Sequence, residues 1–127
     1  MIVSVGIDMI EIERVASALE NPVTGARFRD RVYTQNEIRY CERKLRRKYE
    51  SYAARFAAKE AVMKSLSVGL GAFAFADVEV VRGPGGAPRL SVGGRAAELA
   101  AERAVAGWHL SLTDTATVAV AVAVAYS

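Results

Sequence analysis

The most strongly helical part of this 127-residue sequence, residues 51 to 66, contains the run Arg55-Phe56-Ala57-Ala58-Lys59-Glu60-Ala61-Val62-Met63-Lys64. Ala53, Ala57 and Ala61 recur at i, i+4 and i+8, which lines one face of a helix with small apolar side chains. A second stripe nearby has larger apolar side chains: Tyr52, Phe56, Met63 and Leu66. The pattern predicts a long central helix against which other elements pack.

Three charged side chains interrupt this apolar pattern. Glu60 falls between the two stripes, Lys64 lies one turn further on the same side, and Lys59 points into the stripe of large side chains. Charged groups on the buried side of a helix are costly unless they are compensated. Internal ion pairs with snorkelling lysine stems are one explanation. A functional site is the other.

Another carboxylate follows an apolar run near the start of the sequence. Residues 2 to 7 are apolar and mostly β-branched, which predicts a buried strand that ends at Asp8. Asp8 and Glu60 both need a compensating charge in such surroundings. Mg²⁺ often binds one or two carboxylates together with substrate phosphates. The two acids therefore point to phosphate-transfer chemistry.

The rest of the sequence alternates between helix and strand patterns. Thr34, with Glu37 three residues later, predicts a capping box for a helix that could reach the basic stretch 43–48. Further helices are expected over residues 11–19 and 95–105. The expected strands cover 78–82 and 89–92, joined as a hairpin by the glycine-rich residues 83–88, followed by 108–112 and 117–126.

The last of these strands is apolar on both faces. Its valines at 118, 120, 122 and 124 face one side and its alanines face the other. A strand of this kind must be covered on both faces. The long helix can cover one of them, and we expect another subunit to cover the second. The sequence thus predicts a homo-oligomer.

Composition narrows the class of protein. The chain is 52% hydrophobic and 24% charged, with a formal net charge of +3, which favours an anionic partner but is too small to imply nucleic acid. The lone Cys41 fits a reducing compartment. We expect a cytoplasmic protein, because no leader pattern opens the sequence and its longest apolar run is too short to span a membrane.

Four segments together resemble a known family. Gly6-Ile7-Asp8 with Arg14 is similar to its N-terminal signature, and residues 55–61 with Lys64 are similar to its central signature. Residues 86–90 and 109–113 resemble its later blocks. The family is the bacterial holo-acyl-carrier-protein synthases, the small trimeric type of 4′-phosphopantetheinyl transferase. Asp114 stands where many members have a histidine.

The resemblance implies a fold, a reaction and its partners. The fold is α+β, a single domain over residues 1–127 with an antiparallel sheet packed on a long central helix. The reaction moves the phosphopantetheine arm of coenzyme A to a serine of an apo-acyl carrier protein and releases 3′,5′-adenosine diphosphate, with Mg²⁺ as cofactor. The resemblance also implies a homotrimer with its sites at subunit interfaces, and neither a nucleic acid nor a membrane as partner.

Roles for individual residues follow from the resemblance and from local charge. Asp8 and Glu60 would hold the metal, and Glu60 and Lys64, with Asp8, would be catalytic; the serine proton could leave to Glu60, Asp114 or water. The residues expected to bind coenzyme A are Arg46, Arg47, Lys48, Arg55, Lys64, Pro88 and Ser111. The basic and apolar side chains expected to contact the acidic carrier protein are Arg14, Arg27, Phe28 and Arg31.

Two other functions remain open at this point. The basic stretches 27–31 and 43–48 could neutralise the phosphates of RNA in a small RNA-binding protein. The chain could also be a catalytically silent oligomer that only docks carrier proteins. Neither alternative explains Asp8, Glu60 and Lys64.

Overall fold

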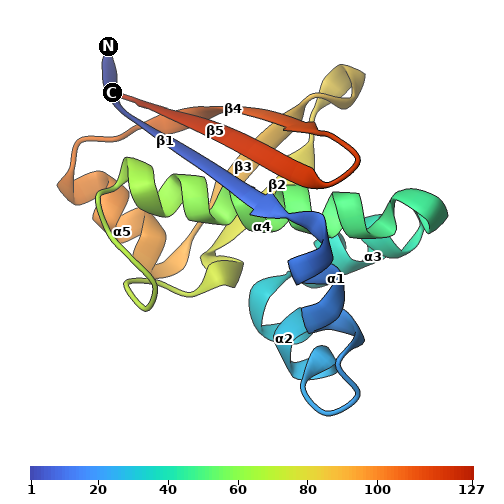
Figure 1. Ribbon diagram of the computed structural model, residues 1–127. Helices are drawn as coiled ribbons and strands as arrows, with labels where there is room; N and C mark the ends of the chain where they lie inside the picture. Colours follow the sequence, from blue (N-terminus) through green and yellow to red (C-terminus); the bar gives the residue numbers. More distant parts are fainter.

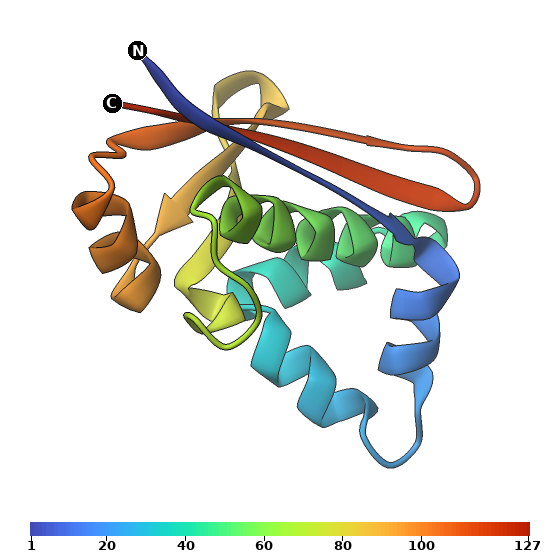
Figure 2. The same cartoon turned by 60° about the vertical axis from the view of Figure 1, so that its left-hand side comes forward.

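A long helix, α4 (Lys48–Ser65), runs through the centre of the molecule (Figure 1). The computed structural model describes all residues, 1–127. The alanine face predicted from the sequence is completely buried at Ala53, Ala57 and Ala61. In the turned view, α4 lies between a three-stranded sheet on one side and smaller helices on the other (Figure 2). The central helix and the α+β fold class are therefore confirmed.

The sheet that covers α4 is antiparallel throughout. Its strands are β1 (Ile2–Glu11), β5 (Val118–Tyr126) and β4 (Gly107–Asp114), in the order β1-β5-β4. The alanines of β5 face α4 and are buried, and its valines face the other way. The prediction of two apolar faces on this strand is confirmed, with α4 covering the alanine face.

The opposite face of the sheet is left open by this chain. On β1 it presents large apolar side chains that are between 42% and 69% exposed: Val3, Val5, Ile7 and Met9. Val122 of β5 lies between Ile7 and Ser111 in this face. A contiguous exposed apolar surface of this kind is typical of an interaction site.

The first strand differs from its prediction in two ways. It is not buried on both faces, and it continues past Asp8, because its pairing with β5 extends to Glu11 opposite Val118. Gly6 allows the strand to approach α4 closely. A Cβ atom at this position would collide with the carbonyl oxygen of Ala61 and the backbone nitrogen of Ser65. This close approach brings the following Asp8 beside the helix.

Three short helices pack around α4 on the side away from the sheet. They are α1 (Ile12–Glu20), α2 (Gly25–Val32) and α3 (Gln35–Glu42). The predicted capping box of α3 is confirmed, because Thr34 Oγ1 accepts from the Glu37 backbone at 3.2 Å and the Thr34 backbone donates to Glu37 Oε1 at 3.0 Å. The sequence did not predict α2, since its alternating arginines give a weak helical pattern.

The basic stretch forms no continuous helix with α3. That helix ends at Glu42, and a separate 3₁₀ turn, η1 (Leu45–Arg47), leads into α4. Leu45 has a φ of 46°, in the left-handed region, which breaks the helical path. The break turns the basic side chains of this segment toward different surfaces.

The remaining elements form a hairpin and a helix beside α4. Strands β2 (Val78–Arg82) and β3 (Pro88–Val92) pair antiparallel through the turn η3 (Pro84–Gly86), as the glycine-rich segment predicts. A 3₁₀ turn, η2 (Phe75–Asp77), precedes β2, and α5 (Gly94–Glu102) follows β3. No helix combines the length and apolar character that crossing a membrane requires.

Candidate active site

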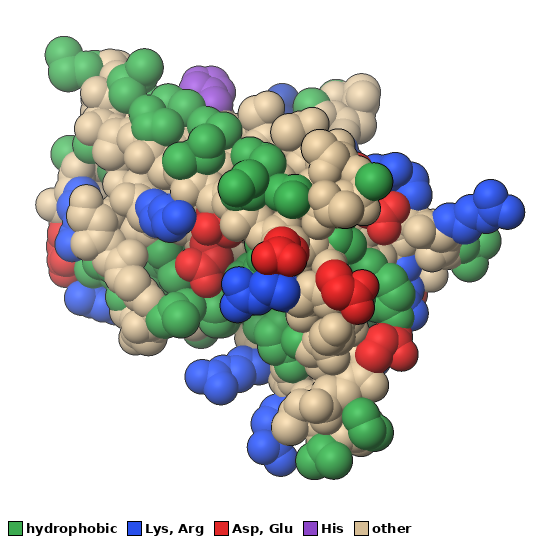
Figure 3. All heavy atoms as spheres, viewed as in Figure 1, with side chains coloured by type: hydrophobic (Ala, Val, Ile, Leu, Met, Phe, Trp, Pro, Cys, Tyr) green, Lys and Arg blue, Asp and Glu red, His purple; other side chains and the backbone are tan.

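Strand β1 and helix α4 bring two carboxylates and a lysine together. The Lys64 Nζ atom lies 3.1 Å from Asp8 Oδ1. Asp8 and Glu60 line one cavity of about 350 Å³ beside α1. We call Asp8, Glu60 and Lys64 the carboxylate site. In Figure 3, acidic and basic side chains lie next to one another over the region where β1 leads into α1.

The carboxyl group of Glu60 has a raised proton affinity. Burial raises the pKa of its carboxyl above the ordinary value, and the nearby charge of Asp8 raises it further. Lys64 opposes both effects without cancelling them. A carboxylate with a raised pKa is a better proton acceptor, which suits a general base.

The carboxylate site fits a hard divalent cation that its substrate helps to bind. No group of three or more His, Cys, Asp or Glu side chains is arranged to hold a metal ion. Two carboxylate residues are nevertheless enough for Mg²⁺ when phosphate oxygens and water complete its coordination. Asp8 and Glu60 are therefore the residues that could hold such an ion.

Lys59 has a structural role. Of the two explanations for the charged side chains of α4, an internal ion pair applies to Lys59. Its side chain is completely buried and its Nζ atom lies 2.8 Å from Glu37 Oε1. The same ammonium group donates to the carbonyl oxygens of Phe75, at 3.2 Å, and Val78. The explanation by internal ion pairs is thus correct for Lys59, while Lys64 remains 54% exposed at the carboxylate site.

A second, strongly basic cavity of about 330 Å³ lies near the N-terminal end of α4. We call it the basic cavity. Its charged side chains are four cations and two carboxylates: Lys44, Arg47, Arg55, Arg82, Glu50 and Asp114. Three of the residues predicted to bind coenzyme A, Arg47, Arg55 and Pro88, meet there. An anion would be attracted to this excess of positive charge.

Arg55 is the most deeply buried cation of this cavity. It is 2% exposed, and no carboxylate pairs with it. Its Nη1 atom donates to the Ser51 carbonyl at 3.3 Å, and its Nε atom has no hydrogen-bond partner. A buried guanidinium with an unused donor is prepared to bind an anion.

Asp114 holds Arg47 in place at the same cavity. Both carboxylate oxygens accept from Arg47 Nη2, at 2.8 and 3.0 Å. This contact raises the pKa of Arg47 and keeps its charge at the cavity. Asp114 is thus engaged with a cation at the basic cavity and does not line the cavity that Asp8 and Glu60 share.

Among the residues of the basic cavity, the sequence did not single out Tyr40 or Arg82, and it indicated Lys44 only as part of the basic stretch 43–48. Tyr40 and Lys44 are one helical turn apart, a spacing that could have indicated a shared face. Arg82 comes from the distant hairpin strand β2, and no local pattern links it to the others.

Other predicted site residues lie apart from both groups. Lys48 pairs with Glu42 at 3.4 Å and lines a different cavity. Arg46 is exposed on η1, and Ser111 is exposed on the open face of the sheet. These three therefore do not join Arg47, Arg55 and Pro88 within one chain.

Three of the four residues predicted to contact a carrier protein line cavities that reach Glu60. Arg14 and Phe28 line the same cavity as Asp8 and Glu60. Arg31 and Phe28 line an adjoining apolar cavity of about 590 Å³, which also reaches Glu60. Arg27 is exposed on α2. A partner that reaches Glu60 would therefore meet arginines and an aromatic ring.

The carboxylate site and the basic cavity do not face one another within this chain. Asp8 lies on the edge strand β1 and Asp114 lies on the opposite edge strand β4, with β5 between them. Arg55 and Glu60 are five residues apart on α4, which separates them by about 7.5 Å along the axis and about 140° around it.

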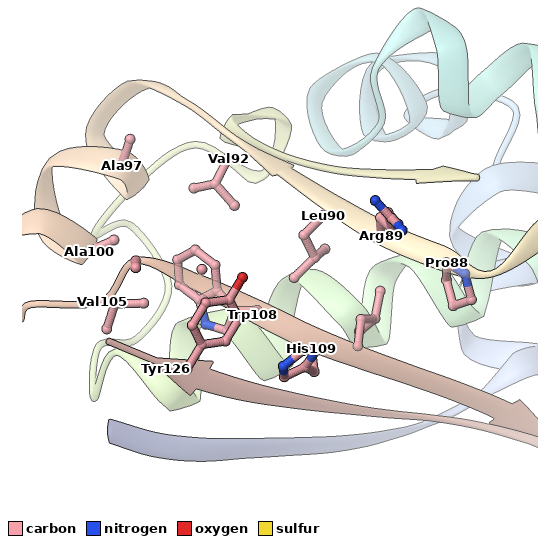
Figure 4. A pocket seen from close by; sticks show the side chains of 13 residues that line it. Pro88, Arg89, Leu90, Val92, Ala97, Ala100, Val105, Trp108, His109 and Tyr126 are labelled. Carbon is pink, nitrogen blue, oxygen red and sulfur yellow. The ribbon is translucent and has the colours of Figure 1, made fainter. Parts of the chain in front are cut away.

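The largest cavity, of about 670 Å³, is separate from the carboxylate site (Figure 4). It opens between β3, β4 and α5, with Leu90, Val92 and Trp108 among its walls. No carboxylate lines it, so it offers no pair of acids for a metal ion. Its size alone does not make it the reactive site.

Comparisons with known proteins identify the family of this chain. A family model of the 4′-phosphopantetheinyl transferase superfamily matches residues 4–123. The holo-[acyl-carrier-protein] synthase of Desulforudis audaxviator is 46% identical over 125 residues, which covers 98% of this chain and 93% of that protein.

Two crystal structures extend the comparison to the fold. The Neisseria meningitidis synthase aligns with a TM-score of 0.86 and 26% identity over the whole of both chains. The Bacillus anthracis synthase, in complex with CoA (3′,5′-ADP), aligns with a TM-score of 0.80 and 34% identity, covering 100% of this chain and 98% of that one. The chain belongs to the 4′-phosphopantetheinyl transferase superfamily, among the holo-[acyl-carrier-protein] synthases.

Proposed function

We propose that this protein transfers the 4′-phosphopantetheine group of coenzyme A to a serine of an apo-acyl carrier protein. The observation that carries the proposal is that Asp8 and Glu60 line one cavity while Lys64 pairs with Asp8 at 3.1 Å. Family membership supports it, and so does the relative from Bacillus anthracis that was crystallised with CoA (3′,5′-ADP).

The bond changes define what these side chains must do. The serine Oγ atom forms a bond to the phosphorus that carries the pantetheine arm. The bond from that phosphorus to the bridging oxygen breaks, and its electron pair leaves with 3′,5′-adenosine diphosphate. Phosphoryl transfer of this kind depends mainly on positioning and on electrostatic stabilisation.

Each residue of the carboxylate site has a distinct task in this scheme. Asp8 and Glu60 would hold a Mg²⁺ ion, which when bound would neutralise pyrophosphate charge and contribute several kcal/mol. Glu60 accepts the serine proton, directly or through a water, because its pKa is raised and its carboxyl borders the cavity. Lys64 stabilises the negative charge of the leaving phosphate.

The basic cavity suits the nucleotide end of coenzyme A. Its four cations exceed its two carboxylates by two charges, which matches the charge of about −1.5 to −2 on a phosphate monoester. Arg47 and Arg55 would bind the 3′-phosphate, with Pro88 beside the adenosine. The unused Nε donor of Arg55 supports this assignment.

The separation of the two groups supports sites that are shared between subunits. The carboxylate site lies near the β1 edge of the sheet, and the basic cavity lies near the β4 edge. A head-to-tail ring would bring the β1 side of one protomer to the β4 side of the next. We infer a homotrimer in which the open apolar face of the sheet is buried and each donor molecule contacts two protomers.

The carrier protein would dock on α1 and α2. Carrier proteins are acidic, and Arg14 and Arg31 line cavities with Phe28 and Glu60, while Arg27 adds an exposed positive charge on α2. Opposite charges speed association and improve selectivity. This surface would bring the serine to the carboxylate site.

One incubation tests the proposed reaction. The protein is mixed with coenzyme A, Mg²⁺ and an apo-acyl carrier protein, and the carrier is weighed by mass spectrometry. The expected result is a gain of about 340 Da, the mass of the phosphopantetheinyl group. A carrier whose acceptor serine is replaced by alanine is the control. An unchanged wild-type carrier, together with salt-sensitive RNA binding, would favour the RNA-binding alternative.

A further inference from the structure

Three cations surround the ring of Tyr40 at the basic cavity. The Cζ atom of Arg55 lies 4.1 Å from the ring centroid, the Nζ atom of Lys44 lies at 4.6 Å and the Cζ atom of Arg82 lies at 5.3 Å. These cations come from separate segments, and their shared neighbour is the aromatic ring on α3. All four residues line the same cavity.

The contact with Arg55 explains how a buried guanidinium is stabilised without a carboxylate. Arg55 is 2% exposed, and its nitrogens make one long hydrogen bond, to Ser51. A buried cation ordinarily needs an opposite charge. The face of an aromatic ring attracts a cation but carries no net charge. Tyr40 therefore stabilises Arg55 and leaves its positive charge uncancelled.

The pKa of the Tyr40 phenol group also indicates that Lys44 and Arg82 lie close to this side chain. Burial alone would raise the pKa of Tyr40, but Lys44 and Arg82 outweigh burial, so that the pKa lies below its ordinary value. An acidic side chain at this position would hold the same cations but would cancel part of the charge available to a ligand. A neutral ring at residue 40 preserves the excess of positive charge.

We propose that Tyr40 is a positioning residue that orients Arg55 and Arg82 toward the 3′-phosphate of the donor. This inference rests on the proposed function, which assigns the basic cavity to that phosphate. Tyr40 acts through the two arginines. Its loss should therefore affect recognition of the 3′-phosphate more than the chemical step.

The test compares coenzyme A with dephospho-coenzyme A, which lacks the 3′-phosphate. In the wild-type enzyme the KM for dephospho-coenzyme A should exceed that for coenzyme A by about tenfold or more, because charged hydrogen bonds are lost. The variant Tyr40→Leu should reduce this KM ratio at least about twofold, toward unity. Its kcat at saturating donor should stay within about twofold of wild type.

Two variants separate positioning from general stability. Tyr40→Phe keeps the ring that contacts Arg55 and should keep a higher KM ratio than Tyr40→Leu. Tyr49→Leu is the matched control, because Lys48 lies 5.2 Å from the Tyr49 ring and that ring lines another cavity. It should leave the ratio unchanged. If Tyr40→Leu does not fold, Tyr40→Glu should abolish the preference, since a carboxylate would neutralise part of the cavity.

The outcomes distinguish this inference from the proposed function. A wild-type ratio in Tyr40→Leu or in Tyr40→Glu would overturn the role of Tyr40 alone. A wild-type enzyme with equal KM values for the two donors would overturn both this role and the phosphate site. A mass gain on the carrier would, in that case, still support the transfer reaction.

Discussion

Glu60 borders two adjoining cavities, and its raised pKa connects its role in the reaction to a cost in stability. The native state holds a proton on this carboxyl to a higher pH than the unfolded chain does. The contribution of Glu60 to stability is therefore greatest below its unfolded pKa and is lost as the pH rises through the raised native value.

The variant Glu60→Gln tests the proposed role of this carboxyl in proton transfer and metal binding. Transfer should fall by about 10²–10⁴-fold or more, because the variant can neither accept a proton nor contribute a full charge to a metal ion. At pH 7 the melting temperature of the variant should equal or exceed that of wild type. Any increase should disappear near pH 4, because the wild-type carboxyl is then protonated and uncharged like the amide. Transfer assays and thermal unfolding at both pH values check this. Near-normal turnover would refute the assigned role.

Lys64 lies at the same site, but it is expected to act on the leaving group. The variant Lys64→Ala should lower kcat by about 10–100-fold with little change in the KM for coenzyme A, because a contact that strengthens in the transition state affects kcat. Steady-state kinetics with varied donor measures both constants. A change confined to KM would instead assign Lys64 to ground-state binding.

At the scale of elements, the buried pair of Lys59 and Glu37 joins four of them: α3, α4, η2 and β2. Lys59 belongs to α4 and donates to carbonyl groups of η2 and β2, while Glu37 of α3 also accepts from the backbone of Val80 at 2.9 Å. Burial lowers the pKa of Lys59, and the charge of Glu37 opposes this effect. The pair therefore aligns α3, α4 and β2 behind the site.

Breaking this pair should destabilise the fold without changing the transfer activity of the folded molecules. Lys59→Met should cost about 3–5 kcal/mol of unfolding free energy, since it leaves the Glu37 carboxylate buried and uncompensated. The double variant with Glu37→Gln should recover part of this loss. Urea unfolding measures both, and activity per folded molecule should be retained. A cost below about 1 kcal/mol for the single variant would contradict a structural role.

Helix α1 offers a test of carrier recognition at the same scale. Arg14→Glu should weaken carrier binding by about tenfold at low salt and should leave coenzyme A binding unchanged, because the charge faces the proposed carrier surface. The difference from wild type should narrow as salt screens it. Titration calorimetry with each ligand measures this, and Arg103→Glu beyond the end of α5 is a matched charge reversal. Equal losses for both ligands would contradict the assignment.

At the scale of the whole molecule, the open apolar face of the sheet is expected to determine the oligomeric state. Val122→Glu places a charge in the middle of this face, opposite Ile7 and Ser111, and should convert a trimer into monomers and abolish transfer. Sedimentation at micromolar concentration and the transfer assay measure this. Ala101→Glu, at an exposed position of α5, is the control. A wild-type monomer would refute shared sites.

Local periodicity carried enough information to predict most of the elements. The alanine spacing of α4, the capping box at Thr34 and the alternation of β5 each depend on side chains within a few residues of one another. Such patterns reflect backbone geometry, so they hold wherever the segment lies in the fold. The second helix, with its arginine-rich pattern, was not predicted because its stability comes from packing on its neighbours.

By itself, the sequence determined the long helix, the two-faced final strand and the presence of acids suited to phosphate chemistry. Only the tertiary structure decided which partner each charged side chain has. Lys59 meets Glu37 inside the protein and Lys64 meets Asp8 near the surface, although the two lysines lie on the same helix. The electrostatic role of a side chain depends on neighbours that arrive from distant segments, and no local pattern records which neighbours those are.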